Sequence, residues 1–338
     1  MEKTLQDYAE KIQKGEVDPI VYYNRSKSGV VFNPQDEKVP LNVVSFGIYQ
    51  LEQGPFIHKT QGREYVLVPV TAEFRVECGS ILFEGSRAGG PFEILPTKSN
   101  SMAVYIPGDS TFKISGKGEV VFFSAPSSGG RKPYFVRSGQ VPLESRGKAF
   151  WRRDIVTLIT PDKISTNLVV GETYSPPGLW SGTPLHIHDK DAPQSGQSDH
   201  EEVYYHLFRY NQGDWGSYGV QLMFNNTGLN KAFVIKDRTA VAIPGAAHPV
   251  VAGPVSDMLY IWGLGGKEGS LGMWDIPEFK FLKDVEKALD QIEKGKPDMV
   301  ISEGRFKGIC DEFNLSEQGI RVLSLILKRK GFNDEVRR

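Results

Sequence analysis

The chain has 338 residues, of which 39% are hydrophobic and 24% are charged, the balance of an ordinary soluble globular protein that is long enough for two domains. Its 40 lysines and arginines against 41 aspartates and glutamates leave a net charge of −1, so charge gives no reason to expect nucleic acid or an anionic membrane as a partner. Two cysteines without metal-binding spacing, the absence of an apolar leader and the absence of any run of 18 apolar residues argue against a disulfide framework, a secretory signal and a membrane span, and predict a cytoplasmic protein.

The first part of the chain is predicted as a helical arm followed by a β-domain. Apolar residues recur at helical spacing in residues 2–14, which predicts a short amphipathic helix, docked on a partner surface, within an N-terminal arm of residues 1–26. From 27 to 130, short runs rich in Val, Ile, Phe and Tyr alternate with Gly, Pro and Asp, the pattern of an antiparallel sandwich or barrel. This region has His58 but no H-x-H pair, so we expect a barrel without metal that serves packing and oligomer contacts.

The rest of the chain repeats the β pattern and then changes to helix. Residues 131–152 are polar and predict a surface linker, and 153–279 resume the short strands, which predicts a second barrel. The final segment, 280–338, is predicted as a small helical appendage. Its helical periodicity is found in residues 279–295 and 316–331.

A metal site is predicted in the second barrel, where five of the six histidines lie between residues 186 and 248. His186 and His188 are two apart on a predicted strand, so their side chains point to one face. Glu202 opens the next strand, and His248 follows a Pro-Gly turn. Because inward side chains of neighbouring strands converge inside a barrel, these residues predict one divalent cation, zinc or manganese, while iron, cobalt and nickel also fit the ligand types.

Neighbouring residues leave alternatives to this ligand set. Glu201 is the rival of Glu202, which is preferred because Val-Tyr-Tyr follows it directly and makes it the first residue of the strand. His200 is expected in the loop, exposed to solvent. His206 is either an inward group beside the ligands or a packed histidine.

Four segments resemble the bicupin family of 5-deoxy-glucuronate isomerases of myo-inositol catabolism, to which the 5-keto-4-deoxyuronate isomerases are related. They are GETYSPPGLWSGTPLHIHD, EEVYYHLF, VAIPGAAHPVVAGP and LYIWGLGG. The resemblance covers roughly residues 40–280 and is strong in 165–275. It implies an all-β fold of two double-stranded β-helix (jelly-roll) barrels in tandem. One departure is Ala246 and Ala247, where the family has a Gly-Tyr pair, and this leaves the exact uronic acid open.

The resemblance also implies an aldose–ketose isomerase, an intramolecular oxidoreductase that converts 5-deoxy-D-glucuronate into 5-dehydro-2-deoxy-D-gluconate. The metal would polarise the substrate carbonyl while a general base moves a proton between C2 and C1. Candidates for that base are Tyr204, His206 and Glu202. Hydroxyl and amide groups would hold the sugar, and an arginine would pair with its carboxylate. The residues expected to bind the substrate in these ways are Tyr174, Arg209, Gln221 and Tyr260.

Three other functions remain open on the sequence. The chain could isomerise another uronate such as 5-keto-4-deoxyuronate. The same ligand types also suit a cupin oxygenase that uses iron or manganese, and a sugar-binding regulatory protein would need no turnover. The expected partners are a small-molecule uronic acid and further copies of the chain in a homo-oligomer, a dimer or higher, with no nucleic acid and no membrane.

Overall fold

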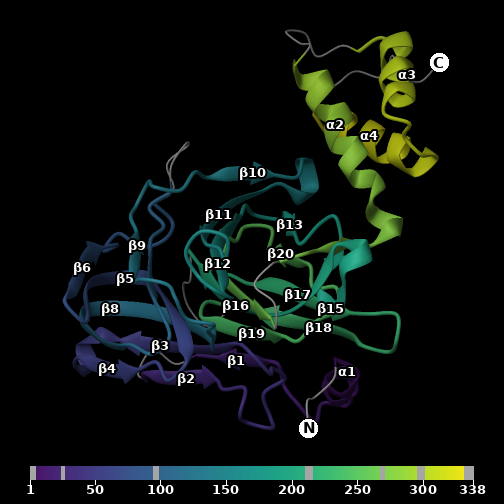
Figure 1. Ribbon diagram of the computed structural model, residues 1–338. Helices are drawn as coiled ribbons and strands as arrows, with labels where there is room; N and C mark the ends of the chain where they lie inside the picture. Colours follow the sequence, from purple (N-terminus) through teal and green to yellow (C-terminus); the bar gives the residue numbers. More distant parts are fainter. Residues whose placement is uncertain are drawn as a thin grey trace.

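The computed structural model describes residues 5–23, 27–93, 99–209, 216–266, 271–294 and 301–330. Within these residues the protein is mostly β, as the sequence predicts, with two large antiparallel sheets and a smaller one (Figure 1). None of the described helices is long and apolar enough to cross a bilayer.

The N-terminal sheet is built around two long antiparallel strands, β5 (Arg63–Cys78) and β8 (Thr111–Pro126). Burial alternates along the second half of β5 because one face of the strand meets the core and the other meets solvent. The remaining strands of this sheet are β2 (Gly29–Phe32), β3 (Ser45–Gln50), β4 (Phe56–Lys59), β6 (Ile81–Ser86), β7 (Ala103–Ile106) and β9 (Tyr134–Val136).

The C-terminal sheet has the order β1-β19-β16-β21-β12-β11-β10, with β15 paired to β16. Its strands are β1 (Ile20–Tyr22), β10 (Glu144–Arg146), β11 (Arg153–Ile159), β12 (Val169–Ser175), β15 (Asp189–Ala192), β16 (Gln197–Phe208), β19 (Thr239–Ile243) and β21 (Met258–Gly266). A smaller sheet contains β13 (Trp180–Ser181), β17 (Gly219–Phe224), β18 (Asn230–Ile235) and β20 (Val250–Ala252). A separate two-stranded pair joins β14 (His186–Ile187) to β22 (Trp274–Asp275).

The two large sheets share one apolar core. Phe46 and Phe123 from the N-terminal sheet belong to the same buried cluster as Tyr205 and Ile261 from the C-terminal sheet. The rings of Phe46 and Tyr205 lie 5.4 Å apart between centroids. The two sheets are therefore joined by a continuous packed interface, which fixes the orientation of the second sheet.

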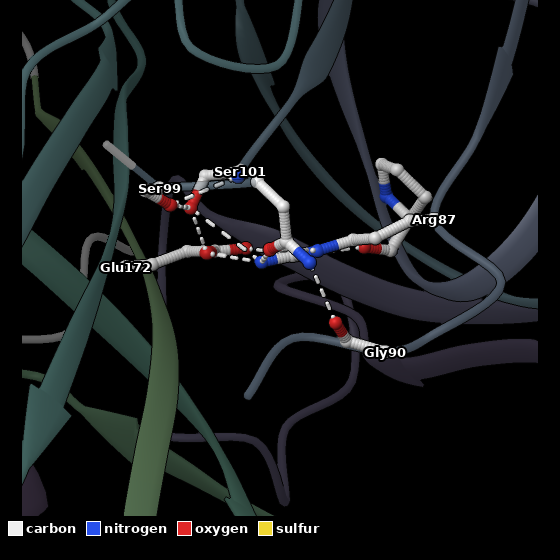
Figure 2. A network of polar contacts seen from close by, with 7 residues as sticks. Arg87, Gly90, Ser99, Ser101 and Glu172 are labelled. Atoms are coloured by element: carbon white, nitrogen blue, oxygen red, sulfur yellow. Dashed lines mark hydrogen bonds and ion pairs between the residues drawn. The ribbon is translucent and has the colours of Figure 1, made fainter. Parts of the chain in front are cut away.

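A buried ion pair crosses the same boundary. Arg87, from the N-terminal sheet, donates from both terminal nitrogens to Glu172 of β12, at 2.5 and 2.7 Å, and the two side chains are 0% and 3% exposed. Figure 2 shows the guanidinium of Arg87 facing the carboxylate, with Ser101 bonded to that carboxylate as well. Asn100 accepts from the guanidinium at 3.0 and 3.1 Å and donates to the carbonyl of Gly90, so the arginine is held from several sides.

The N-terminal arm packs on the C-terminal sheet. Helix α1 (Leu5–Lys14) is confirmed, and its apolar face buries Tyr8 and Ile12 in the core that also contains Val169 and Ile243. Strand β1 then pairs with β19 at the edge of the C-terminal sheet. The arm thus pairs with the second half of the chain, while Tyr8 donates its hydroxyl to the carbonyl of Leu41 in the first half.

Residues 131–152, predicted as a linker, add an edge strand to each large sheet. Strand β9 pairs with β7 in the N-terminal sheet, and β10 pairs with β11 in the C-terminal sheet. A short 3-10 helix, Ala149–Trp151, follows and ends directly before β11.

The C-terminal helices form a unit of their own, residues 281–294 and 301–330, which stands at one corner of the molecule (Figure 1). Helices α2 (Phe281–Lys294) and α4 (Glu317–Arg329) confirm the two predicted helices; residues 295 and 331, the predicted last residues, lie outside the described part. The sequence analysis missed α3 (Glu303–Glu312), which carries two glycines and a weak apolar face. Trp151 packs into the core of this helical unit, so the unit is anchored on the chain just before β11.

Candidate metal centre

Three predicted ligands converge. Suitable ligand atoms of His188, Glu202 and His248 all lie within 4.8 Å of one another, and the three side chains are buried. The Nε2 atoms of His188 and His248 are 3.4 and 3.2 Å from Oε2 of Glu202. A compact group of two imidazoles and a carboxylate is a suitable site for a borderline divalent cation.

The backbone fixes the tautomer of each predicted histidine ligand. Each ring donates its Nδ1–H to a main-chain carbonyl: His186 to Pro184 (3.0 Å), His188 to His200 (2.8 Å) and His248 to Ala246 (2.8 Å). A carbonyl oxygen only accepts hydrogen bonds, so Nδ1 carries a proton and Nε2 is the nitrogen that faces the other ligands and could bind a metal. This second hydrogen bond is the arrangement that orients a metal-binding histidine.

His186 lies beside the group without being part of its tight cluster. Its ring centroid is 5.8 Å from that of His248 and 6.3 Å from that of His188. Its strand, β14, is two residues long and pairs only with β22 among the described strands. The structure therefore brings three of the four predicted ligands together and leaves the fourth next to them.

The electrostatics favour an ionised carboxylate beside a neutral His186 ring, while contact with that carboxylate raises the pKa of His188 against the effect of burial. Burial alone would raise the pKa of Glu202, but contacts with His188 and His248 hold that pKa down at about 2. Burial, helped by the neighbouring histidines, lowers the pKa of His186 to about 4. The site therefore offers negative charge and lone pairs together, which a cation can neutralise.

Alternation along β16 separates the two neighbouring glutamates. Glu202 points to the metal group, while Glu201 points the other way and accepts from the backbone N–H groups of Asn42, Val43 and Val44 at 2.5, 2.7 and 3.3 Å. The preference for Glu202 over Glu201 agrees with this placement, but its stated reason was wrong. Glu202 lies inside β16, which begins at Gln197.

The two other histidines of this region are both fully buried. His200 was expected in an exposed loop, which is wrong: it lies in β16, is 0% exposed and shares a hydrogen bond of 2.8 Å with Ser198. His206 is also 0% exposed and donates its Nδ1–H to the carbonyl of Thr239 at 3.2 Å. Its ring packs at 5.6 Å from that of Tyr260, which favours the packed histidine of the two alternatives.

A cavity of about 700 Å³ opens over the metal group. Its wall follows from the strand registers, because residues opposite one another in neighbouring strands face the same side. Ile155 of β11 lies opposite Thr173 of β12, and Thr173 lies opposite Tyr260 of β21. Four residues further along β21, on the same face, Leu264 lies opposite Glu202 of β16. The wall residues that matter below are Arg153, Ile155, Thr173, Tyr204, Tyr260 and Trp262.

Two residues predicted to bind substrate lie elsewhere. Tyr174 donates its hydroxyl to Asp257 at 2.8 Å, and Arg209 lies 3.5 Å from the same carboxylate. Arg209 also donates to the carbonyl of Phe92, in the N-terminal half, at 2.6 Å. Neither residue lines the cavity over the metal group, so their predicted contacts with the substrate do not fit their positions.

The other two predicted substrate residues differ from each other. Gln221 is fully buried and donates to the carbonyl of His248 at 2.7 Å, so it stabilises the backbone that carries this candidate ligand. Tyr260 does line the cavity, and its hydroxyl lies 2.5 Å from that of Ser181. Tyr204, a predicted catalytic residue, also lines the cavity, whereas His206 does not.

The sequence analysis missed Arg153. It starts β11, and Arg153, Ile155 and Thr157 alternate along the strand and all line the cavity. The alternation in the sequence RDIVTLIT could have shown this, because Val156 and Leu158 on the opposite face are buried in the shared core.

Comparisons with known proteins agree with one another. A family model described as KduI/IolB family matches residues 21–282. Curated proteins named 5-deoxy-glucuronate isomerase are similar to this chain. The one from Geobacillus kaustophilus is 26% identical over 80% of this chain and 97% of its own, and the one from Shouchella clausii is 29% identical over 77% and 93%.

Solved structures share the fold. An IolB-like protein from Salmonella typhimurium LT2 superposes with a TM-score of 0.71 and 24% identity, covering 79% of this chain and 100% of its own. The oxalate decarboxylase of Bacillus subtilis, which has Mn(II) centres, gives a TM-score of 0.51 at 11% identity, covering 91% and 86%. At these identities the two structures support the architecture alone.

Proposed function

The chain belongs to the KduI/IolB family, and from that premise we propose that it is a metal-dependent aldose–ketose isomerase that converts 5-deoxy-D-glucuronate into 5-dehydro-2-deoxy-D-gluconate. That it is an enzyme of the isomerase class is confirmed, since the curated relatives carry that name. The observation that carries the finer proposal is the convergence of His188, Glu202 and His248 beside a cavity that His188 and Glu202 line. We also propose that the chain folds as two jelly-roll barrels in tandem and forms a homo-oligomer in the cytoplasm.

The donor set fits a divalent cation, zinc or manganese, held by His188, Glu202 and His248 with His186 as the fourth ligand. Each imidazole has its Nδ1 proton bonded to a carbonyl, and the Nε2 atoms of His188 and His248 face the carboxylate of Glu202, so both can turn a lone pair to a cation once it replaces any proton there. When bound, the cation would supply a Lewis acid that polarises the substrate carbonyl.

Two residues that line the cavity, Tyr204 and Glu202, have different roles in proton transfer. Burial raises the pKa of Tyr204 well above its usual value, so its phenol stays neutral and donates a hydrogen bond to a substrate oxygen. Glu202 contacts both histidines through Oε2 and interacts with the phenol of Tyr204, so we assign these two adjacent groups the transfer of the proton. In the forward direction a proton leaves C2 and one is returned to C1, while the C2 hydroxyl proton passes to the C1 oxygen.

The wall of the cavity orients the substrate. Tyr260 presents a hydroxyl whose pKa burial raises, so it too is a donor to sugar oxygens. His206 packs behind Tyr204 and Tyr260, at ring distances of 5.8 and 5.6 Å, and we assign it the support of these rings in place of proton transfer.

A second substrate within the same reaction class is favoured by one observation. Ala246 and Ala247 replace the Gly-Tyr pair of the family, and both are packed in the structure. A uronate with a different substituent, such as 5-keto-4-deoxyuronate, is therefore the alternative to test beside 5-deoxy-glucuronate.

The two adjacent glutamates provide a matched test. Metal content of the purified chain is measured by elemental analysis, and isomerisation of 5-deoxy-glucuronate is followed without oxygen, in the wild type, Glu202→Gln and Glu201→Gln. We expect about one metal per chain with turnover in the wild type, and the loss of both in Glu202→Gln. Glu201→Gln should keep metal and turnover while its stability falls, because its contacts are the amides of residues 42–44.

The opposite results are equally informative. Metal retained in Glu202→Gln, or turnover unaffected by it, removes the proposed centre. Bound metal without turnover of either uronate would refute the isomerase and leave oxygen-dependent chemistry or sugar binding.

A further inference from the structure

Arg153 presents a cation to the cavity, and the one carboxylate in the described part of the chain that acts on its charge, Glu286, does so from beyond ion-pair distance. It lines the same cavity as His186 and Glu202. Its NH1 donates to the carbonyls of Trp151 and Thr183, at 3.2 and 2.8 Å, and its buried Nε has no hydrogen-bond partner. Among the described residues no carboxylate forms an ion pair with it.

An arginine in this position calls for an anionic ligand. Removing a guanidinium from water is costly unless an opposite charge or full hydrogen bonding compensates for it. Burial lowers the pKa of Arg153, which reflects that cost. A planar guanidinium with unused donors is suited to a carboxylate, to which it can donate two parallel hydrogen bonds.

The location agrees with the shape of an open-chain sugar acid. Thr183, which accepts from Arg153, is three residues before His186, so the guanidinium lies near the strand that carries the histidines. Tyr204 and Tyr260 line the same cavity. A uronic acid has its aldehyde at one end and its carboxylate at the other, so it can reach the metal group and the arginine at once.

We propose that Arg153 binds the carboxylate of the sugar acid, an inference that rests on the proposed function. The C-terminal helical unit holds Arg153 in place through Trp151 and Glu286. Arg153 selects acids over neutral sugars. Trp151 and Glu286 are positioning residues, since they touch the arginine or its anchor and do not line the cavity.

The anchoring contacts are continuous. The indole N–H of Trp151 donates to Glu286 of α2 at 2.5 Å, and the carbonyl of Trp151 accepts from Arg153. Trp151 is 4% exposed, enclosed by the core of the helices. The segment before it is held as well, since Lys148 pairs with Asp290 of α2 at 2.5 Å. The helices thus determine where the carbonyl that orients Arg153 lies.

The placement gives the C-terminal helical unit a role in substrate binding. The family model ends at residue 282, so nearly all of the helical unit lies beyond the part of the chain that it matches. The barrel would provide the chemistry, and this added unit would set the affinity for the charged end of the substrate.

The test compares two sugars that differ at one end. Binding of D-glucuronate and D-glucose to the metal-loaded full chain is measured by titration calorimetry. The wild type should prefer glucuronate, and Arg153→Gln should weaken glucuronate binding roughly 10- to 100-fold with glucose unchanged, as expected for a lost charged hydrogen-bonding contact. Arg153→Lys, which keeps the charge, should restore part of the preference.

The helical contact is tested by a matched pair on α2. Glu286→Ala should raise KM for the uronate severalfold with kcat little changed, whereas Asp284→Ala, which removes an acid that pairs with Lys287 on the exposed side of α2, should not. Equal loss in both variants, or no loss in Glu286→Ala, would overturn the role of the helices.

The outcomes separate this inference from the proposed function. Turnover with an unchanged KM in Arg153→Gln, or a wild type that binds both sugars equally, overturns the inference and leaves the isomerase standing. A wild type that shows an Arg153-dependent preference for glucuronate but no turnover supports the inference and overturns the isomerase. If Arg153→Gln does not fold, Arg153→Lys and Glu286→Ala decide.

Discussion

The Arg87–Glu172 ion pair links the two halves of the chain, and removing either partner should show how much this pair contributes to the free energy of unfolding. Removing one member of a buried pair leaves a charge without compensation and costs about 3–5 kcal/mol of unfolding free energy. The structure predicts which loss is larger. After Arg87→Met, Glu172 keeps only Ser101, whereas after Glu172→Leu the arginine keeps Asn100 and the carbonyl of Pro69.

The loss of unfolding free energy should therefore lie near the upper end of that range for Arg87→Met and near the lower end for Glu172→Leu. The double variant should lose less than Arg87→Met alone, because no unpaired charge remains. A coupling energy of about 2–3 kcal/mol is expected from the double-mutant cycle. Arg75→Met, at an ion pair whose side chains are 49% and 62% exposed, is the control and should have no measurable effect.

The assay is urea unfolding followed by tryptophan fluorescence and near-ultraviolet circular dichroism. Two probes are needed because a chain with two packed sheets can depart from two-state unfolding. Additive losses in the double variant, or a loss from Arg75→Met equal to that from Arg87→Met, would refute the reasoning.

Three further predictions concern stability. Ile12→Ala should lower the unfolding free energy by about 2–4 kcal/mol, because the 2% exposed side chain fills the core under α1; denaturant titration checks this, and a loss below about 1 kcal/mol would contradict the docking of the arm. Chelation should lower the melting temperature of the metal-loaded wild type but not that of His188→Ala, since a ligand of the folded state stabilises by mass action; equal shifts would contradict the site. Burial lowers the pKa of His206 from 6.5 to about 3, so the folded chain keeps it neutral and loses stability as the pH falls below 6.5. Between pH 7 and pH 5 the wild type should lose about 2 kcal/mol more than His206→Leu, and parallel losses would contradict this.

The metal group could be read from the sequence because its geometry is local. H-x-H on a strand and a glutamate on the next depend only on alternation and on strands meeting inside one sheet. His200 was misplaced because the boundary of β16 lies three residues before it, and Gln197 and Ser198 give no strand signal. Strand ends depend on the partner strands, here β15 and β21, which the local sequence does not reveal.

The cavity wall was harder to predict because it depends on register and on distant segments. Tyr174 and Tyr260 are both tyrosines on neighbouring strands, yet Tyr260 lies opposite Thr173 and faces the cavity, while Tyr174 is one position further and faces Asp257. A shift of one residue moves a side chain to the other face. Arg209 was chosen for its charge, but the surface that it meets includes Phe92 from the other half of the chain.

The pairing of β1 with β19 has a consequence for how the chain comes to be folded. Residues 20–22 pair with residues 239–241, so this segment is synthesised long before the strand with which it pairs. Contacts of such long sequence separation form slowly, and until then both strand edges are unpaired. A nascent or truncated chain that lacks β19 leaves the arm without its dock, and removal of the arm leaves β19 as an open edge. The arm thereby acts as a cover against strand-to-strand aggregation, and its loss should show first as a lower yield of soluble protein.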